Sequence, residues 1–155
     1  MSNSTPSPPP EYIYKILPSS PPPPVPLPVS LPLSALDARD NFMHFSTSYQ
    51  LLGTLQNFFS SEAQVYILRV PYERVAGFVL WEDAKGKRPD ENGGHWDVEG
   101  SRGFFPHVYA NAGPGTGEQG LKLGRDEVES VGLWKKSGGL WSPEGWPFGE
   151  DIPRE

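Results

Sequence analysis

The sequence predicts an α+β domain, in which several short strands are combined with one main helix. Six short segments are rich in β-branched and aromatic residues, as strands are. One longer stretch repeats its apolar residues at the spacing of a helix that buries one face. Prolines and glycines separate these segments and interrupt any longer element. At 155 residues the chain has the length of a single domain.

The N-terminal region is dominated by proline. Twelve of the 19 prolines lie within residues 1–32, and the fixed φ and missing N–H of proline keep such runs out of helices and central strands. Residues 1–10 are expected to form a disordered tail ahead of the domain. Tyr12–Leu17 has the composition of a strand that stops at Pro18. The loop 18–32 is expected to be extended polyproline II on the surface, where its valines and leucines could still cover the core.

The next segment predicts a strand followed by the main helix. Phe42–Ser46 is the second strand, and alternation along it places His44 and Ser46 on the same face. Thr47 and Gln50 have the spacing of a capping box, which predicts that the helix begins at Thr47. The helix is expected to end near Ser60, with an apolar face made of Leu51, Leu52, Leu55, Phe58 and Phe59.

The rest of the domain, which is expected to span residues 11–136, consists of strands joined by polar loops. Four further strands are predicted, at Gln64–Val70, Phe78–Glu82, Phe104–Tyr109 and Val128–Leu133. Residues 85–103 are polar and rich in glycine, and they predict a long loop. The tail 137–155 is rich in glycine and tryptophan, and Trp141 and Trp146 are expected to pack back onto the domain.

The composition excludes several functional classes. The chain has no cysteine, so it has no disulfide, no thiolate metal site and no cysteine nucleophile. A net charge of −6 without a long Lys/Arg cluster argues against nucleic-acid binding, although it does not exclude a local site for a small anion. No run reaches the roughly 18 apolar residues of a membrane-spanning helix, and no secretion signal opens the chain. We therefore expect a cytoplasmic protein that binds neither nucleic acid nor membrane.

Two of the three histidines lie inside apolar, strand-like runs and mark the candidate site. His44 lies in the run Phe42–Ser46 and His107 in the run Phe104–Tyr109, with Glu82 at the end of a strand between them. A buried imidazole needs hydrogen-bond partners, and a nearby carboxylate supplies one. His44, Glu82 and His107 are therefore the candidate catalytic residues.

His44 also lies three residues before the predicted helix start at Thr47. The unpaired N–H groups and the dipole of a helix N-terminus favour an anion, and they would favour the neutral form of the imidazole. A phosphate or carboxylate would then bind beside Ser46 and Thr47. The plainer interpretation is that these two residues only cap the helix and that His44 only braces it, and residue patterns alone favour it.

Two other kinds of site are less well supported. His44, Glu82 and His107 have the ligand count of a two-histidine, one-carboxylate metal site, but neither histidine has Asp or Glu two residues later. The pair with that spacing, His95 and Asp97, lies in the polar loop, so we expect no metal site. A serine hydrolase is weaker still, because Ser46 does not lie in a Gly-x-Ser-x-Gly turn.

Four motifs, taken together in order, are more specific than any one alone: Ile13–Leu17, Phe42–Thr47 with Gln50, Trp81–Glu82 and Phe105–Tyr109. In order and spacing they resemble the DUF952 family of small uncharacterised proteins, and the Ile-Leu-Pro opening looks most like the fungal members. The resemblance spans residues 12–131. The usual Gly-Phe-Ile-His-Leu-Ser-Thr of the family is here Asn41–Thr47, a change that keeps the polar residues.

The family is similar in fold to ADP-ribosyltransferases, which implies split antiparallel sheets around a cleft that binds NAD in the active members. NAD is thus a cofactor candidate by fold analogy alone. Alternation along Val79–Glu82 places Trp81 and Glu82 on opposite faces unless the strand bends there.

The proline loop stands where many bacterial members have a helix, and the loop 85–103 looks enlarged, so the lid of the cleft is in doubt. The candidate ligand-binding residues are Lys15, Ser46, Thr47, Gln50, Trp81 and Tyr109.

Two functions from different classes follow. The favoured one is binding of a nucleotide or other anionic small molecule, with NAD-glycosidic transfer or acid–base chemistry by His44 and His107 as its catalytic extension. The alternative is a non-catalytic interaction or regulatory domain that docks through the proline-rich segment and the Trp-rich tail. Lys15–Pro21 has the spacing of an SH3 ligand, but Lys15 lies within a strand, so an SH3-type partner is not expected. A third possibility is that both histidines are core braces.

Overall fold

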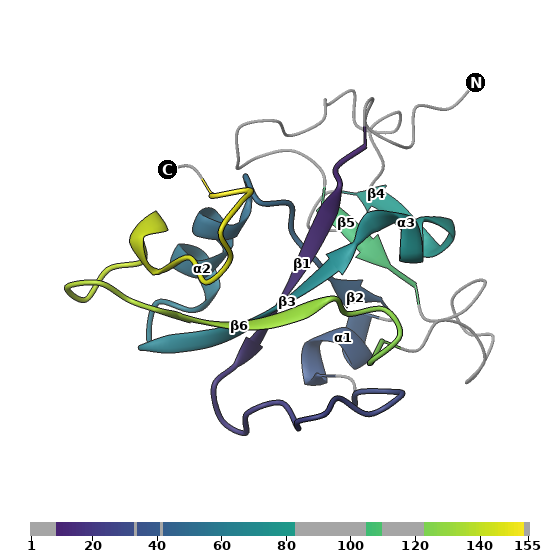
Figure 1. The fold of residues 1–155 in the computed structure, drawn as a ribbon, viewed down its shortest axis with the longest axis horizontal. Helices are drawn as coiled ribbons and strands as arrows, with labels where there is room; N and C mark the ends of the chain where they lie inside the picture. The colour runs from purple at the N-terminus through teal and green to yellow at the C-terminus, as the bar shows by residue number, and fades with distance from the viewer. Residues whose placement is uncertain (1–8, 33, 41, 83–104, 110–122, 154–155) are drawn as a thin grey trace.

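Two three-stranded antiparallel sheets form the framework of the computed structural model (Figure 1). The structure describes residues 9–32, 34–40, 42–82, 105–109 and 123–153. The predicted loop 85–103 and most of the predicted disordered tail lie outside these residues. Two small antiparallel sheets with few helices confirm the α+β class.

The first sheet consists of β1 (Tyr12–Pro18), β3 (Gln64–Pro71) and β6 (Ser130–Lys135), with β3 in the centre. Ile13 pairs with Val70, and Leu68 pairs with Val131. The central strand is buried on both faces, which explains its nearly continuous apolar sequence. The predicted strands Tyr12–Leu17 and Gln64–Val70 match β1 and β3 within one residue, whereas β6 begins two residues later than predicted.

The second sheet consists of β2 (Met43–His44), β5 (Phe105–Val108) and β4 (Val79–Glu82), with β5 in the centre. The strand predicted at Phe42–Ser46 is shorter than expected because the chain leaves this sheet after His44. Ser46 instead forms an isolated bridge with Tyr14 of β1, with both N···O distances 2.8 Å. The segment after His44 thus links the second sheet to the first.

Two apolar clusters hold these sheets in a layered arrangement. The first cluster joins residues of the first sheet, such as Ile13 and Leu68, to Met43, Trp81 and Val108 of the second sheet. The second cluster lies on the opposite face of the first sheet, where α2 (Leu51–Phe58) and the C-terminal segment pack against it. Figure 1 shows α2 and the yellow C-terminal segment together on one side of the first sheet.

The main helix is shorter than the predicted one. Leu51, Leu52 and Leu55 are buried in the second cluster as expected, but Phe58 at the helix end is exposed. Trp141 is buried in the same cluster, and Trp146 packs against it. Both tryptophans thus pack back onto the domain, as the sequence predicted.

None of the short helices was predicted from the sequence. The connection before His44 contains α1 (Ala35–Asp40), and the Ser34 Oγ accepts a 3.0 Å hydrogen bond from the Asp37 N–H at the start of this helix. The other short helices are α3 (Tyr72–Val75), η1 (Ala76–Phe78) and η2 (Pro143–Gly145). Within the described residues, no helix has the length and apolar character needed to cross a bilayer.

The proline loop is fixed to the domain by backbone hydrogen bonds. The Leu31 N–H donates to Leu123 and the Arg125 N–H donates to Pro28, with N···O distances of 2.7 and 2.9 Å. Between them, Gly124 lies so close that an added Cβ would meet backbone oxygens of the loop at 2.0 and 2.4 Å. The leucines of the loop, Leu27 and Leu31, pack against the first cluster as expected, but its valines are exposed.

Candidate functional site

The two histidines of interest lie directly opposite each other in the second sheet. His44 of β2 pairs with His107 of β5, and their ring centroids are 5.6 Å apart. Side chains alternate between the faces of a strand, so Met43 and Val108 point into the first cluster while the histidines occupy the other face. The strand register therefore brings together two imidazoles that are 63 residues apart in sequence.

His107 is held by Glu82 and by an aromatic ring. Its Nδ1 is 2.9 Å from the Glu82 Oε1, and both side chains are buried. The hydroxyl of Tyr109 donates to the same carboxylate, with distances of 2.9 and 3.1 Å to its two oxygens. The Phe42 ring stacks on the His107 imidazole, with the centroids 4.0 Å apart. Together these contacts fix the orientation of the His107 ring.

His44 is bound by two carboxylates of α1. Its Nδ1 is 2.6 Å from the Asp37 Oδ1 and its Nε2 is 3.0 Å from the Asp40 Oδ2. The His44 backbone N–H also donates to Asp37, at 3.1 Å. The groups that face the His44 ring in this structure are therefore the Asp37 and Asp40 carboxylates.

Lys15 of β1 contacts both Asp37 and His44. Its ammonium is 2.7 Å from the Asp37 carboxylate and 3.2 Å from the His44 carbonyl oxygen. Burial lowers the pKa of the Lys15 ammonium, and the charge of Asp37 opposes that shift. Burial acts to raise the pKa of Asp37, but the hydrogen bond from His44 and the charge of Lys15 outweigh it and hold this pKa below its usual value. Asp37 is therefore ionised near neutral pH.

The start of the main helix differs from the prediction. α2 begins at Leu51 and is preceded by a turn, and no side chain caps its N-terminus. Half of the expected capping box is present, because the Gln50 Oε1 accepts a 2.9 Å hydrogen bond from the Thr47 N–H. The Thr47 Oγ1 is buried and has no partner among the described residues. Thr47 is thus not the helix cap, and the helix start does not direct the His44 ring.

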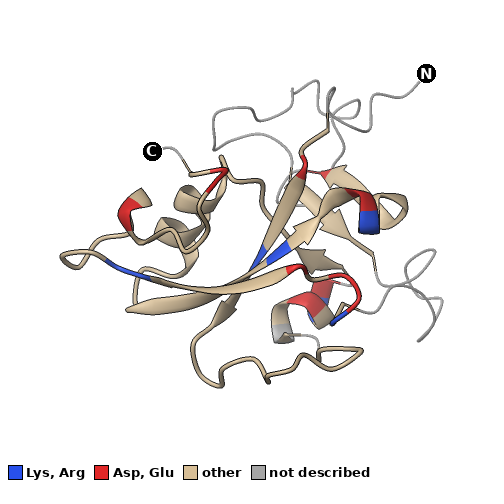
Figure 2. Ribbon diagram, in the orientation of Figure 1, with Lys and Arg blue, Asp and Glu red and all other residues tan. Residues whose placement is uncertain are grey.

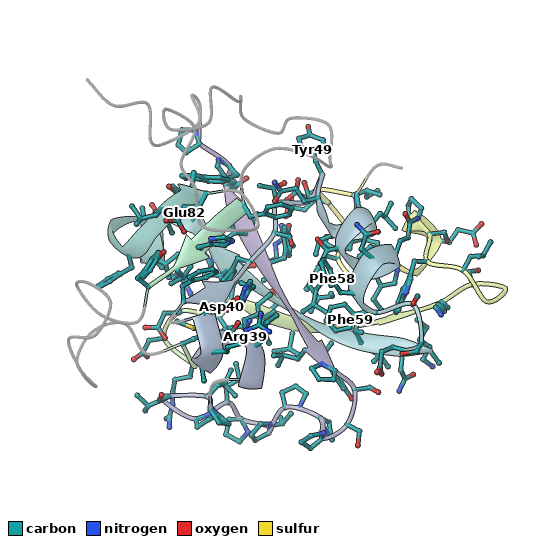
Figure 3. All side chains as sticks on the ribbon, turned by 180° about the vertical axis from the view of Figure 1, so that it is seen from behind. Arg39, Asp40, Tyr49, Phe58, Phe59 and Glu82 are labelled. Carbon is teal, nitrogen blue, oxygen red and sulfur yellow. The ribbon has the colours of Figure 1, made fainter. Side chains whose placement is uncertain are left out.

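Two further candidates do not join the histidine pair. Trp81 faces the first cluster, where its Nε1 donates to the Tyr72 hydroxyl at 3.2 Å. Ser46 contacts the Thr54 hydroxyl of α2, with the oxygens 3.3 Å apart. The site that the structure assembles therefore consists of Lys15, Asp37, Asp40, Phe42, His44, Glu82, His107 and Tyr109. In Figure 3, Asp40 and Glu82 lie on the same side of the molecule, on α1 and β4.

The site combines two imidazole–carboxylate pairs. In each pair a carboxylate lies within hydrogen-bond distance of Nδ1 and fixes the ring orientation, an arrangement that suits a general acid or base. The chain thus has the groups for proton transfer on one face of a small sheet.

Comparison with known proteins identifies the family. The sequence model of DUF952, a family of proteins of unknown function, matches residues 29–131. The chain belongs to the DUF952 family. The match includes α1, α2 and both histidines, whereas β1 lies before it although it forms one edge of the first sheet.

A solved structure of similar fold supports the architecture. The crystal structure of protein CC0527 from Caulobacter crescentus is similar over 83% of this chain and 91% of that one, with a TM-score of 0.53 and 22% sequence identity. The structure of a double mutant of the same protein gives the same values. No functionally curated protein matches the chain. The structural similarity shows the fold, and the family match shows that the chain is a DUF952 protein.

Sequence reasoning missed the two carboxylates that bind His44 in this DUF952 chain. A usable signal exists, because Ser34 and Asp37 have the spacing of a capping box and so indicate a helix start. Asp40 then follows one helical turn later, on the same side of the helix as Asp37.

Among the described residues, no group of three His, Asp or Glu side chains has the geometry to hold a metal ion.

Proposed function

We propose that this DUF952 protein binds a small anionic ligand, such as a nucleotide, at the His44–His107 pair, and that the two imidazoles give the site acid–base capacity. The observation that carries the proposal is the facing of two imidazoles, each bound at Nδ1 by a buried carboxylate. Burying ionisable pairs costs desolvation energy that an apolar core would avoid, so their presence favours a functional role over simple bracing.

Asp40 marks the position that the anion would take. The side chains of His44 and Asp40 are 29% and 25% exposed, whereas Asp37 is 1% exposed. An incoming phosphate or carboxylate would replace Asp40 on the His44 Nε2 and leave the Asp37 contact on Nδ1 intact. The Arg39 guanidinium, which binds Asp40 at 2.9 Å, lowers the pKa of that carboxyl and provides a second partner for it after displacement.

Aromatic side chains around the histidines would contact the ring system of a nucleotide. Phe42 lies against both imidazoles, with its centroid 4.6 Å from that of His44, and Tyr109 is tilted against Phe42 at 5.4 Å. Stacked or tilted aromatic pairs add to affinity beyond the area they bury. Glu82 and His107 would act as the acid–base pair, and Lys15 and Asp37 would position His44.

NAD and ADP-ribose are the first nucleotides to test, because the family resemblance implies an ADP-ribosyltransferase-like arrangement of the two sheets. Two antiparallel three-stranded sheets that pack through an apolar cluster support that proposal. NAD-glycosidic transfer is the catalytic extension, and its readout, release of nicotinamide, is separate from binding. Ser46, Gln50 and Trp81 would support the site indirectly, through their contacts with Thr54, Thr47 and Tyr72.

Calorimetric titration with NAD, ADP-ribose and inorganic phosphate tests the proposal. We expect His44→Ala to weaken binding at least about tenfold, equivalent to about 1.4 kcal/mol, because it removes the main polar contact. Asp40→Asn should instead strengthen binding, because it weakens the internal competitor for the His44 Nε2. Gln56→Ala, at an exposed position of α2, is the matched control and should leave affinity unchanged.

Two results would contradict this function. One is unchanged affinity for every tested anion in a His44→Ala variant that keeps the thermal midpoint of the Gln56→Ala control. The other is a loss of thermal stability in His44→Ala and His107→Ala with no saturable binding by the wild type, which would identify both histidines as core braces.

A further inference from the structure

The C-terminal segment 146–153 lies on the α2 side of the first sheet, away from the histidines, and it packs there as a bound peptide would. Residues 146–153 contain no helix or strand, yet they pack closely on this sheet. Trp146 and Phe148 lie against the Tyr14 ring, with centroid distances of 5.2 and 6.1 Å. Pro147 fits over Gly132 of β6, where an added Cβ would be 2.6 Å from the proline ring. The absence of a side chain at Gly132 thus allows Pro147 to pack directly on β6.

Two consecutive carboxylates of the segment meet buried donors. Asp151 accepts hydrogen bonds from the Tyr14 hydroxyl at 2.6 Å and from the Ser48 hydroxyl at 3.0 Å, and both donor residues are buried. Glu150 is bound by Arg69, with an Nη2···Oε2 distance of 3.0 Å. Each carboxylate of the segment therefore has its own partner in the framework.

The two sides of this contact differ in character. The receiving residues are fixed in strands and a turn: Arg69 is 6% exposed in its side chain and stacks on Tyr12 at 3.8 Å. The Glu150 side chain is 70% exposed, and Asp151 has a left-handed φ of 61° that is rare outside glycine. Burial raises the pKa of Tyr14 well above its usual value and the bond to Asp151 adds to this, so the phenol stays a donor. A rigid, buried set of donors thus receives one continuous irregular segment.

We propose that this face of the first sheet is a peptide-binding groove, and that its resident occupant is the segment 146–153 of the same chain. The groove recognises an aromatic residue, a second aromatic two positions later, and an acidic pair four and five positions after the first, as in Trp146, Phe148, Glu150 and Asp151. The same segment of a second copy of this chain meets these requirements and replaces the resident one in trans.

The test uses the full chain and a labelled synthetic peptide with the sequence of residues 146–153. The variant E150Q/D151N removes the charges through which the resident segment contacts Arg69, Tyr14 and Ser48, so that this segment leaves the groove more readily. We expect the peptide to bind this variant saturably, and to bind wild type at least about tenfold more weakly because the tethered segment competes at high effective concentration. Fluorescence anisotropy measures both affinities.

Matched controls separate recognition from nonspecific adhesion. A peptide with Gln and Asn at the two acidic positions should not bind, and adding Ser48→Ala to the double variant should weaken binding by removing one donor to the carboxylate. The proposal is overturned if a folded double variant binds no peptide saturably, if the neutral peptide binds equally well, or if wild type binds as tightly as the variant. If the double variant does not fold, D151N alone replaces it, with the same expected and contrary results.

Discussion

Lys15 is the residue on which the histidine site rests. It lies in an otherwise apolar strand, on the face that packs against the second sheet, and its ammonium joins Asp37 and the His44 carbonyl. A lysine at this depth is retained only with a partner, because an isolated buried charge is very costly. The strand-like sequence around Lys15 concealed this role, since spacing alone does not show what a lysine in a strand will face.

The substitution Lys15→Met should destabilise the protein by about 3–5 kcal/mol, because it leaves the buried Asp37 carboxylate without its cation. Urea unfolding at neutral pH measures the effect. Lys135→Met, at an exposed position of β6, is the matched control and should change the free energy of unfolding by less than about 0.5 kcal/mol. A loss of less than about 1 kcal/mol in Lys15→Met would show that the pair contributes little.

At the scale of elements, the short helix α1 supplies the two carboxylates that contact the His44 ring. It is six residues long, and it presents Asp37 and Asp40 to the two nitrogens of His44. A helix this short is marginal by itself, so its cap and its contacts with β2 hold it in place. The geometry around His44 therefore depends on the first turn of α1.

Ser34→Ala should cost about 1 kcal/mol, because it removes the hydroxyl that accepts the Asp37 N–H at the start of α1. The same change should loosen both carboxylate contacts of His44, which NMR of the His44 ring protons would detect. Ser60→Ala, at an exposed position just after α2, should alter neither quantity. Unchanged ring signals in Ser34→Ala would mean that His44 holds α1 rather than the reverse.

The sequence predicted strands better than helices, for a physical reason. Strand signals come from local composition, and Tyr12–Leu17 and Gln64–Val70 fall within one residue of the observed strands. α1 has too few residues to show a helical repeat, so only its cap could reveal it. The Thr47–Gln50 spacing does form a hydrogen bond, but in a turn before α2, because a spacing does not specify the conformation in which it is used. The facing of His44 and His107 depends on strand register, which only the tertiary structure defines.

At the scale of the whole molecule, burial of the first sheet on both faces decides where its charges find partners. Figure 2 shows one basic band on β1 and one on β3, which are Lys15 and Arg69. The register places them on opposite faces, so Lys15 pairs with Asp37 of α1 while Arg69 pairs with Glu150 of the C-terminal segment. Each face of the sheet is thus joined by an ion pair to a segment distant in sequence.

Global stability should decrease in acid because of Asp37. Its pKa in the folded protein is held below the unfolded value of about 3.9, so its stabilising contribution is present above that pH and is lost as the pH falls through the folded pKa. Thermal midpoints measured between neutral pH and acid should therefore decline below about pH 4. In Asp37→Asn this part of the decline should be absent and the midpoint at neutral pH lower, whereas a curve parallel to wild type would show that Asp37 does not contribute.

The strand pairings also determine when the site comes into existence. Ile13 pairs with Val70, Leu68 with Val131 and His44 with His107, so each contact closes a long loop of chain. Closing such loops costs conformational entropy before the contact returns any energy, which places folding of this kind on the slow side for small domains. No tight hairpin among the described strands offers a local nucleus. The two imidazoles therefore meet only when the chain completes its long-range pairing, and a partly folded chain lacks the His44–His107 pair.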